Sequence, residues 1–136
     1  MMNKFFFNPF SGNYFIIRSR ARRKAPAGPD VERMRAQAKA TLPPRLEELA
    51  RQHGFTYSRL FIKNNVSNWG SCSSRKNINL NLRLVSLPPQ LQDYVMLHEL
   101  CHLKHLNHGP EFHALLESVC PGHRTLAKEL RQYRIR

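Results

Sequence analysis

Our expectation for the fold rests on one stretch of sequence, Asp93-Tyr-Val-Met-Leu-His-Glu-Leu-Cys-His-Leu-Lys-His-Leu-Asn-His108. It follows Pro88-Pro89, which suits the start of a helix, and it is closed by Gly109-Pro110, because the residue before a proline avoids the α region. Apolar and histidine side chains recur within it at three- and four-residue steps. The pattern predicts one long helix, from about Gln90 to Leu106, and a further helix from Pro110 to Val119.

Within the long helix, the motif His98-Glu-Leu-Cys-His102 has the spacing of a metal site. Four residues rotate a helix by about 40° beyond a full turn, so both imidazoles project from one face and can share an ion. Zinc is the metal that we expect, and it lowers the pKa of a bound water. Glu99 lies about 100° round the helix, placed to accept the proton of that water. The motif therefore predicts metal-assisted hydrolysis.

A catalytic zinc site needs a third protein ligand. His105 stays on the same helical face but lies about 10 Å along the axis from the first histidine, so the three rings could not converge. His108 follows Asn107, which tolerates left-handed backbone, and precedes Gly109-Pro110. A chain that stops and turns there can return His108 to the ion, and we favour it over His105. Two glutamates of the next helix remain alternatives: Glu111 and Glu117.

The residues before the long helix complete an α+β pattern, with a single domain expected over residues 31–136. Asp30 is expected to cap the first helix, and Pro43-Pro44 to separate it from the second. Strict alternation of apolar and polar residues predicts a half-buried strand. The helices and strands expected here are Val31–Ala40, Arg45–Gln52, Leu60–Ile62 and Ile78–Leu84.

Charge is the unusual feature of the composition. The chain of 136 residues has 22 Lys and Arg against 9 Asp and Glu, a formal net charge of +13, which favours anionic partners. Residues 1–30 are expected to form a basic N-terminal extension that is loosely structured or strand-like. Its basic run is a candidate contact for nucleic acid or an acidic protein, as an accessory property. The run consists of Arg18, Arg20, Arg22, Arg23 and Lys24.

Cysteine usage and hydropathy bear on location. The three cysteines lack a C-x-x-C pair, which argues against a disulfide framework and indicates a reducing compartment, so we expect a cytoplasmic protein. No run of 18 apolar residues predicts a membrane span. Cys101, within the metal helix, is expected to pack as a small hydrophobe. Ser71 and Cys72 lack the neighbouring groups that a nucleophile needs.

Taken with three upstream motifs, the long-helix stretch closely resembles the YgjP-like metallopeptidase family, a small zincin relative of the SprT-like proteases. The upstream motifs are Trp69-Gly-Ser-Cys-Ser73, Asn77-Ile-Asn-Leu-Asn81 and Leu87-Pro-Pro89. The resemblance covers about residues 31–136. It implies a zincin-like catalytic domain, with a small β-sheet packed on the active-site helix that carries HExxH. It also implies one zinc ion held by His98, His102 and His108, with Glu99 as the catalytic glutamate.

Two activities remain open for such a chain: peptide hydrolysis and a nucleotide pyrophosphatase activity on UTP at the same metal site. A third reading is a truncated, inactive metal-binding module with a basic docking surface, because the first 30 residues do not resemble the larger β-rich half of the relatives. Asn68 and His113 also depart from them, replacing Arg and an aromatic residue, commonly Trp. We expect Trp69, Ser71 and Asn79 to contact substrate, with core packing as the alternative for Trp69 and a solvated strand face for Asn79.

Overall fold

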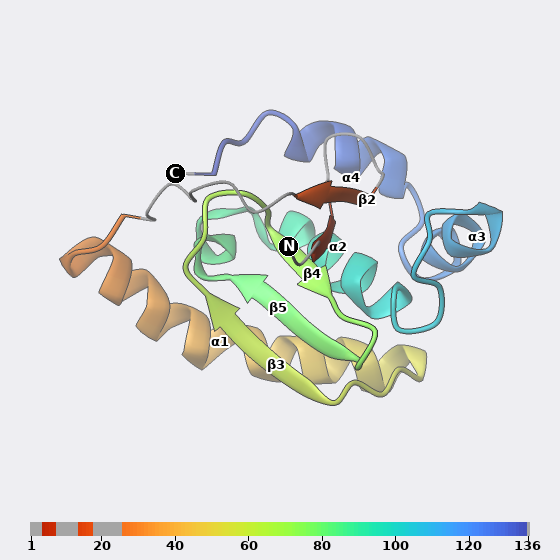
Figure 1. Cartoon of the computed structure of the whole chain (residues 1–136), viewed down its shortest axis with the longest axis horizontal. Coiled ribbons are helices and arrows are strands. Elements are labelled where there is room, and N and C mark those ends of the chain that lie inside the picture. The colour runs from red at the N-terminus through yellow and green to blue at the C-terminus, as the bar shows by residue number, and fades with distance from the viewer. Residues whose placement is uncertain (1–3, 8–13, 18–25, 136) are drawn as a thin grey trace.

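A computed structural model describes the backbone of residues 4–7 and 14–17 and the whole of residues 26–135. It confirms the predicted α+β class, with helices gathered around a small sheet (Figure 1). In chain order the elements are β1 (Lys4–Phe7), β2 (Tyr14–Ile17), α1 (Pro29–His53), β3 (Arg59–Lys63), β4 (Gly70–Cys72), β5 (Asn77–Asn81), the 3-10 helix η1 (Leu82–Ser86), α2 (Pro89–Cys101), α3 (Pro110–Val119) and α4 (His123–Leu130).

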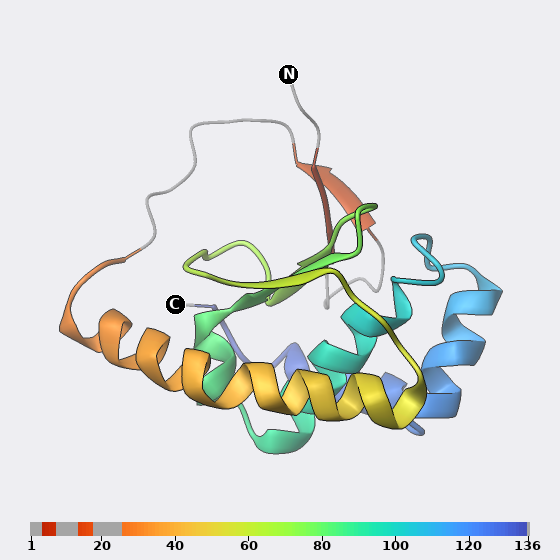
Figure 2. The ribbon, with the colours of Figure 1, turned by 90° about the horizontal axis from the view of Figure 1, so that it is seen from below.

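The central sheet has the strand order β3-β5-β4. β3 runs parallel to β5, with Arg59 opposite Asn77, and β4 runs antiparallel to β5, with Gly70 opposite Leu80. Ile78 and Leu80 of β5 are fully buried. Figure 2 shows the helices on one side of this sheet. The single helix-covered face explains the alternation of apolar and polar residues along β5.

The N-terminal part contributes a second, two-stranded sheet. β1 pairs with β2 in antiparallel register, with Lys4 opposite Ile17. β1 also contacts β4, and Figure 2 shows the hairpin on the side of the sheet opposite α1. The basic run from Arg18 to Lys24 lies outside the described residues, so its contact with nucleic acid or an acidic partner stays a prediction.

The first helix differs from the prediction of two helices separated by Pro43-Pro44. α1 is continuous through both prolines, begins at Pro29 after an N-cap at Gly28 and ends at His53, where Gly54 forms a left-handed C-cap. The two prolines leave the carbonyls of Lys39 and Ala40 without helical donors, and both residues are exposed, so water can solvate them. Leu42 and Leu46 on the opposite side are buried. Their packing outweighs the cost of the prolines.

The strand predicted over Ile78–Leu84 is also shorter than expected. β5 ends at Asn81, and η1 follows although the apolar alternation continues. Asn81 is fully buried, its amide donates to the carbonyls of Asn65 and Asn68 at 2.9 Å each, and its side-chain oxygen accepts from the backbone N–H of Arg83 at 3.0 Å. This capping interaction starts a new helical turn, which periodicity alone could not indicate.

α1 and α2 are joined by charge as well as by packing. Arg45 of α1 donates to both carboxylate oxygens of Asp93 in α2, at 2.8 and 2.6 Å. α2 is buried on every side from Tyr94 to Cys101, because the sheet, α1, α3 and α4 all pack on it. The helix that carries the HExxH motif is therefore the centre of the core.

Candidate metal centre

The two histidines of the motif lie on α2 as the spacing predicts. The side chains of His98 and His102 are buried, and their ring centres are 4.7 Å apart. Burial is possible because the flanking residues of the helix are apolar, including Met96 and Leu100, which are fully buried. A low-dielectric setting of this kind strengthens any charge interaction at the site.

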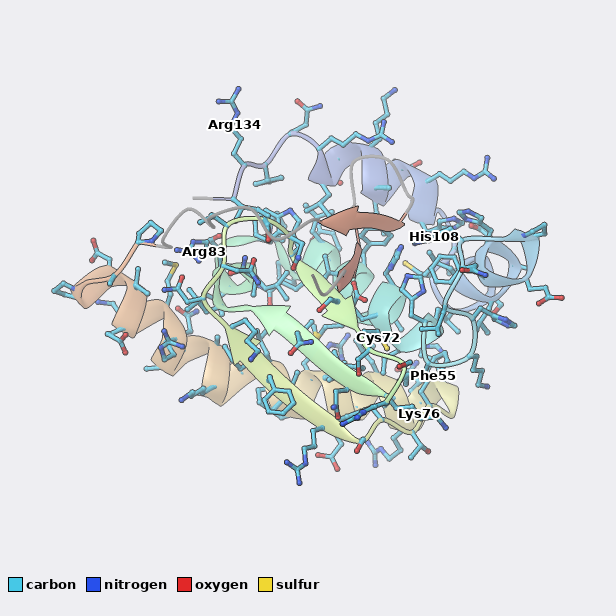
Figure 3. The ribbon with its side chains drawn as sticks, in the orientation of Figure 1. Phe55, Cys72, Lys76, Arg83, His108 and Arg134 are labelled. Atoms are coloured by element: carbon cyan, nitrogen blue, oxygen red, sulfur yellow. The ribbon has the colours of Figure 1, made fainter. Side chains whose placement is uncertain are left out.

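The helix ends earlier than predicted, and this brings in the third histidine. α2 stops at Cys101, and the next residues form a tightened turn in which the N–H groups of Leu103 and Lys104 donate three residues back. Asn107 does not adopt the left-handed backbone considered in the sequence analysis. The tightened turn redirects the chain, so that His108 returns to the two helical histidines in the loop between α2 and α3 (Figure 3).

The first histidine group consists of His98, His102 and His108. One donor nitrogen from each lies within 4.8 Å of the other two. The His108 ring centre is 5.1 Å from that of His98 and 4.7 Å from that of His102. Phe112 of α3 packs against all three rings and is stacked on His102 at 4.3 Å. Three neutral imidazoles converging beneath an apolar ring suit a zinc-like ion.

Backbone geometry orients the ring of His102. Its Nδ1 lies 2.9 Å from the carbonyl oxygen of His105. A carbonyl can only accept, so Nδ1 carries the proton and Nε2 is the atom that can bind a metal. His105 therefore supports the group through its main chain. Its own side chain is not in the group, and its Nδ1 lies 3.5 Å from Glu111.

Burial keeps the three histidines neutral. It lowers the pKa of His98 well below the ordinary range, and it lowers the pKa values of His102 to about 3 and of His108 to about 4. Repulsion from neighbouring histidines adds to each shift. Neutral imidazole is the form that binds metals, so near neutral pH the group needs to lose no proton before an ion binds.

Glu99 is an acidic side chain buried in the core next to the histidines. Its side chain is fully buried, and neither carboxylate oxygen has a hydrogen-bond partner within the part of the chain that the structure describes. Its Oε2 lies 3.9 Å from Nδ1 of His98. Burial raises the pKa of Glu99 well above its usual value. A buried carboxylate with a raised pKa binds a proton more tightly than an ordinary glutamate does, which suits a general base.

The backbone of β4 covers this carboxylate. A methyl group added at Gly70 would lie 3.2 Å from Cγ and 3.3 Å from Oε2 of Glu99. Trp69 and Ser71, on either side of Gly70, were expected to contact substrate. The structure places Trp69 in the core with 1% of its surface exposed, and Ser71 in β4, where its Oγ accepts from the Asn79 amide at 3.1 Å. Ser71 and Asn79 therefore act as a linked pair across two strands.

The remaining candidates fall outside the first histidine group. Cys101 is fully buried, and burial raises the pKa values of Cys101 and Cys72 to about 12, so neither is a thiolate at neutral pH. Glu117 lies against His123 in a separate cluster. Two residues of this region, Phe112 over the site and His123, were not predicted from the sequence. The spacing of His113 and Glu117, one helical turn apart, was the available signal for the second cluster.

Within the described residues, no helix is both long enough and apolar enough to cross a bilayer.

Comparisons with known proteins agree with this geometry. Residues 29–133 match the family described as YgjP-like, metallopeptidase domain. No curated protein sequence matches the chain. The crystal structure of the metallopeptidase zymogen of Pyrococcus abyssi abylysin is similar with a TM-score of 0.54 and 27% identity, over 64% of this chain and 85% of that one. The metallopeptidase zymogen of Methanocaldococcus jannaschii jannalysin is similar in fold, with a TM-score of 0.56 and 22% identity, over 77% of this chain and 97% of that one.

Proposed function

Because the chain belongs to the YgjP-like metallopeptidase family, we propose that it is a zinc-dependent peptidase whose ion is held by His98, His102 and His108. Its family and its structural neighbours make it a metal-dependent hydrolase. The observation that carries the finer proposal is the fully buried Glu99 beside three converging histidines. A bound zinc ion would polarise the scissile carbonyl and lower the pKa of an attacking water.

The side chains at the site have separate proposed roles in metal binding and proton transfer. The three histidines hold the ion in neutral form, and Glu99 accepts a proton from the attacking water and returns it to the leaving amine. The raised pKa of Glu99 supports both transfers, because a stronger base takes the proton readily and its acid form persists long enough to donate it. Phe112 keeps bulk water from the rings.

Substrate contact is proposed for β4 and its neighbours. β4 is an edge of the three-stranded sheet, and Gly70 places it directly over Glu99. Because β1 lies against β4, an extended peptide that adds to this edge through main-chain hydrogen bonds would take the place of β1. Ser71 lies in this edge strand and Asn79 in the adjacent central strand β5, and the two are the candidates for polar contact, whereas Trp69 is buried behind them.

The decisive experiment compares Glu99→Gln with the wild type on a panel of quenched fluorescent peptides, with zinc content measured on the same samples. The change should reduce turnover by about 10²- to 10⁴-fold while zinc is retained, because Gln cannot accept the proton. Glu111→Gln is the matched control, since that carboxylate is 84% exposed on the next helix. Equal peptide turnover in the wild type and Glu99→Gln at full zinc occupancy would contradict the proposal.

A second candidate function is hydrolysis of nucleotide phosphates such as UTP, which the net charge of +13 favours. The same samples should then release pyrophosphate from UTP, and release that persists in Glu99→Gln would count against this function. If zinc binds stoichiometrically and neither substrate is turned over in a Glu99-dependent way, the chain is a metal-binding module with a basic docking surface.

A further inference from the structure

A second histidine group lies beside the first and is formed by His113, Glu117 and His123. His113 and Glu117 are one turn apart on α3, so both side chains leave the same face of that helix. The chain then reverses through Cys120–Gly122, where Gly122 adopts a left-handed backbone with φ of 78°. This reversal returns His123, the first residue of α4, to the α3 face.

Glu117 orients the ring of His123. Its Oε1 accepts the backbone N–H of Gly122 at 3.1 Å, and its Oε2 accepts from Nδ1 of His123 at 2.5 Å. These two hydrogen bonds lower the pKa of Glu117, so the group is a carboxylate that can only accept. The proton of His123 is therefore on Nδ1, and the lone pair of the neutral ring is on Nε2. A carboxylate behind a histidine is the arrangement that supports histidine ligands of metals.

The two imidazoles of the group each retain a buried nitrogen without a hydrogen bond. Nε2 of His123 and Nδ1 of His113 have no partner within residues 26–135, and the side chain of His123 is only 7% exposed. A buried polar atom without a partner is costly to a fold, and a water or an ion is what satisfies such an atom. The ring centres are 5.9 Å apart with 24° between the planes. Two imidazoles on one ion at about 2.0–2.1 Å from each nitrogen have ring centres roughly 5–6 Å apart.

We propose that His113 and His123 bind a second divalent transition-metal ion, through Nδ1 and Nε2 respectively, with Glu117 as the supporting carboxylate. Imidazole ligands suit zinc, copper and nickel, and water completes the coordination of a site with two protein ligands. Glu117 offsets the charge of an incoming cation, against the opposing charge of Arg124 nearby. The His113 ring centre is 6.4 Å from that of His108, so the two ions would occupy neighbouring sites.

The sequence spacing of the second histidine group supports the proposed second site, because it matches that of the first group. The first histidine group has the pattern H-x₃-H-x₅-H, from His98 to His108, and the second has H-x₃-E-x₅-H, from His113 to His123. In both, two side chains one helical turn apart are joined by a histidine from beyond the end of the helix. The proposal does not depend on peptidase activity, because it concerns metal uptake alone.

The test is zinc uptake by the full chain after chelation, measured by equilibrium dialysis over a range of free zinc with metal content read by plasma mass spectrometry. The wild type should take up two equivalents and His123→Phe one, because the aromatic ring preserves the stacking but cannot bind metal. Glu117→Gln should weaken the second equivalent about 10- to 100-fold. His53→Asn, at the end of α1, is the matched control and should bind like the wild type.

Two further variants keep the outcome unambiguous. His102→Ala should lose the first equivalent and keep the second, which separates failure of this proposal from failure of the proposed function. His113→Phe replaces the other proposed ligand and should also take up one equivalent of zinc. It serves in place of His123→Phe if circular dichroism shows that His123→Phe is unfolded. Uptake of a single equivalent by the wild type, or equal uptake by the wild type and a folded His113→Phe or His123→Phe variant, overturns the second site.

Discussion

The two histidine groups share one spacing and differ in what their middle residue does. In the first group the middle residue is His102, fully buried, with its Nδ1 bound to a backbone carbonyl and its Nε2 directed to the metal centre. In the second group the middle residue is Glu117, whose side chain is 54% exposed. It hydrogen-bonds to Nδ1 of His123 and is not itself one of the proposed metal ligands. Spacing therefore brings three side chains together, whereas burial and the identity of the middle residue decide how many of them can bind an ion.

The largest expected effect is at the middle residue of the first group. His102→Ala should weaken zinc binding at that group by roughly 10²–10³-fold, because a binding free energy of about 10–16 kcal/mol is shared among a few ligands. His105→Ala is the control and should retain zinc, since the residue contributes its carbonyl. Competition with a calibrated zinc chelator measures both. Similar losses in the two variants would mean that the ring of His105 is a ligand.

Gly70→Ala tests the burial that distinguishes the first group. The added methyl group would lie 3.2 Å from both the Asn79 carbonyl oxygen and Glu99 Cγ, so β4 or Glu99 must shift. We expect a loss of about 1–3 kcal/mol in the free energy of unfolding and roughly tenfold lower peptide turnover, with zinc affinity little changed. Urea denaturation and the peptide assay check these outcomes.

Gly109→Ala is the matched control for that substitution. Its φ of −81° suits any residue, and a methyl group there would meet nothing within 4 Å. It should leave stability and turnover unchanged. If both variants behaved like the wild type, the close cover of Glu99 by β4 would have no bearing on catalysis.

A smaller effect should follow from loosening α2, the helix that carries His98 and Glu99 of the first site. Asp93→Asn removes the carboxylate charge that accepts two hydrogen bonds from Arg45. The site is partly exposed, with side-chain exposures of 27% for Asp93 and 39% for Arg45. The free energy of unfolding should fall by about 1 kcal/mol. Glu48→Gln, which removes the weaker partner of the same arginine, should change stability less. Chemical denaturation ranks the two variants, and a reversed order would contradict a stabilising role for the charge of Asp93.

The smallest effect concerns the carboxylate of the second group. The pKa of Glu117 is lowered in the folded chain by its bonds to Gly122 and His123, so its stabilising contribution is fully present above the ordinary glutamate pKa. That contribution disappears as the pH falls through the lowered value. The melting temperature of Glu117→Gln should therefore lie slightly below that of the wild type at pH 6, and the difference should shrink as the pH is lowered below the ordinary glutamate pKa. A difference independent of pH would show that the charge of Glu117 does not matter.

Much of the architecture was predictable because local chemistry and tertiary packing agree. The α+β class follows from periodicity, and the position of α3 follows from Pro110. The predictions failed where packing or a single polar side chain overrode the local pattern. Buried Leu42 and Leu46 carry α1 through Pro43-Pro44, and the amide of Asn81 ends β5 before the alternation stops.

By itself, the sequence determined that His98 and His102 share a helical face with Glu99 beside them, because the helical repeat is a local property of the chain. It also carried the family resemblance that the match over residues 29–133 confirms. Only the tertiary structure decided that α2 ends at Cys101 and returns His108, that Gly70 covers Glu99, and that His123 meets His113. These features depend on chain reversals and on contacts between distant segments, whose energies come from burial and from hydrogen bonds that no local pattern encodes.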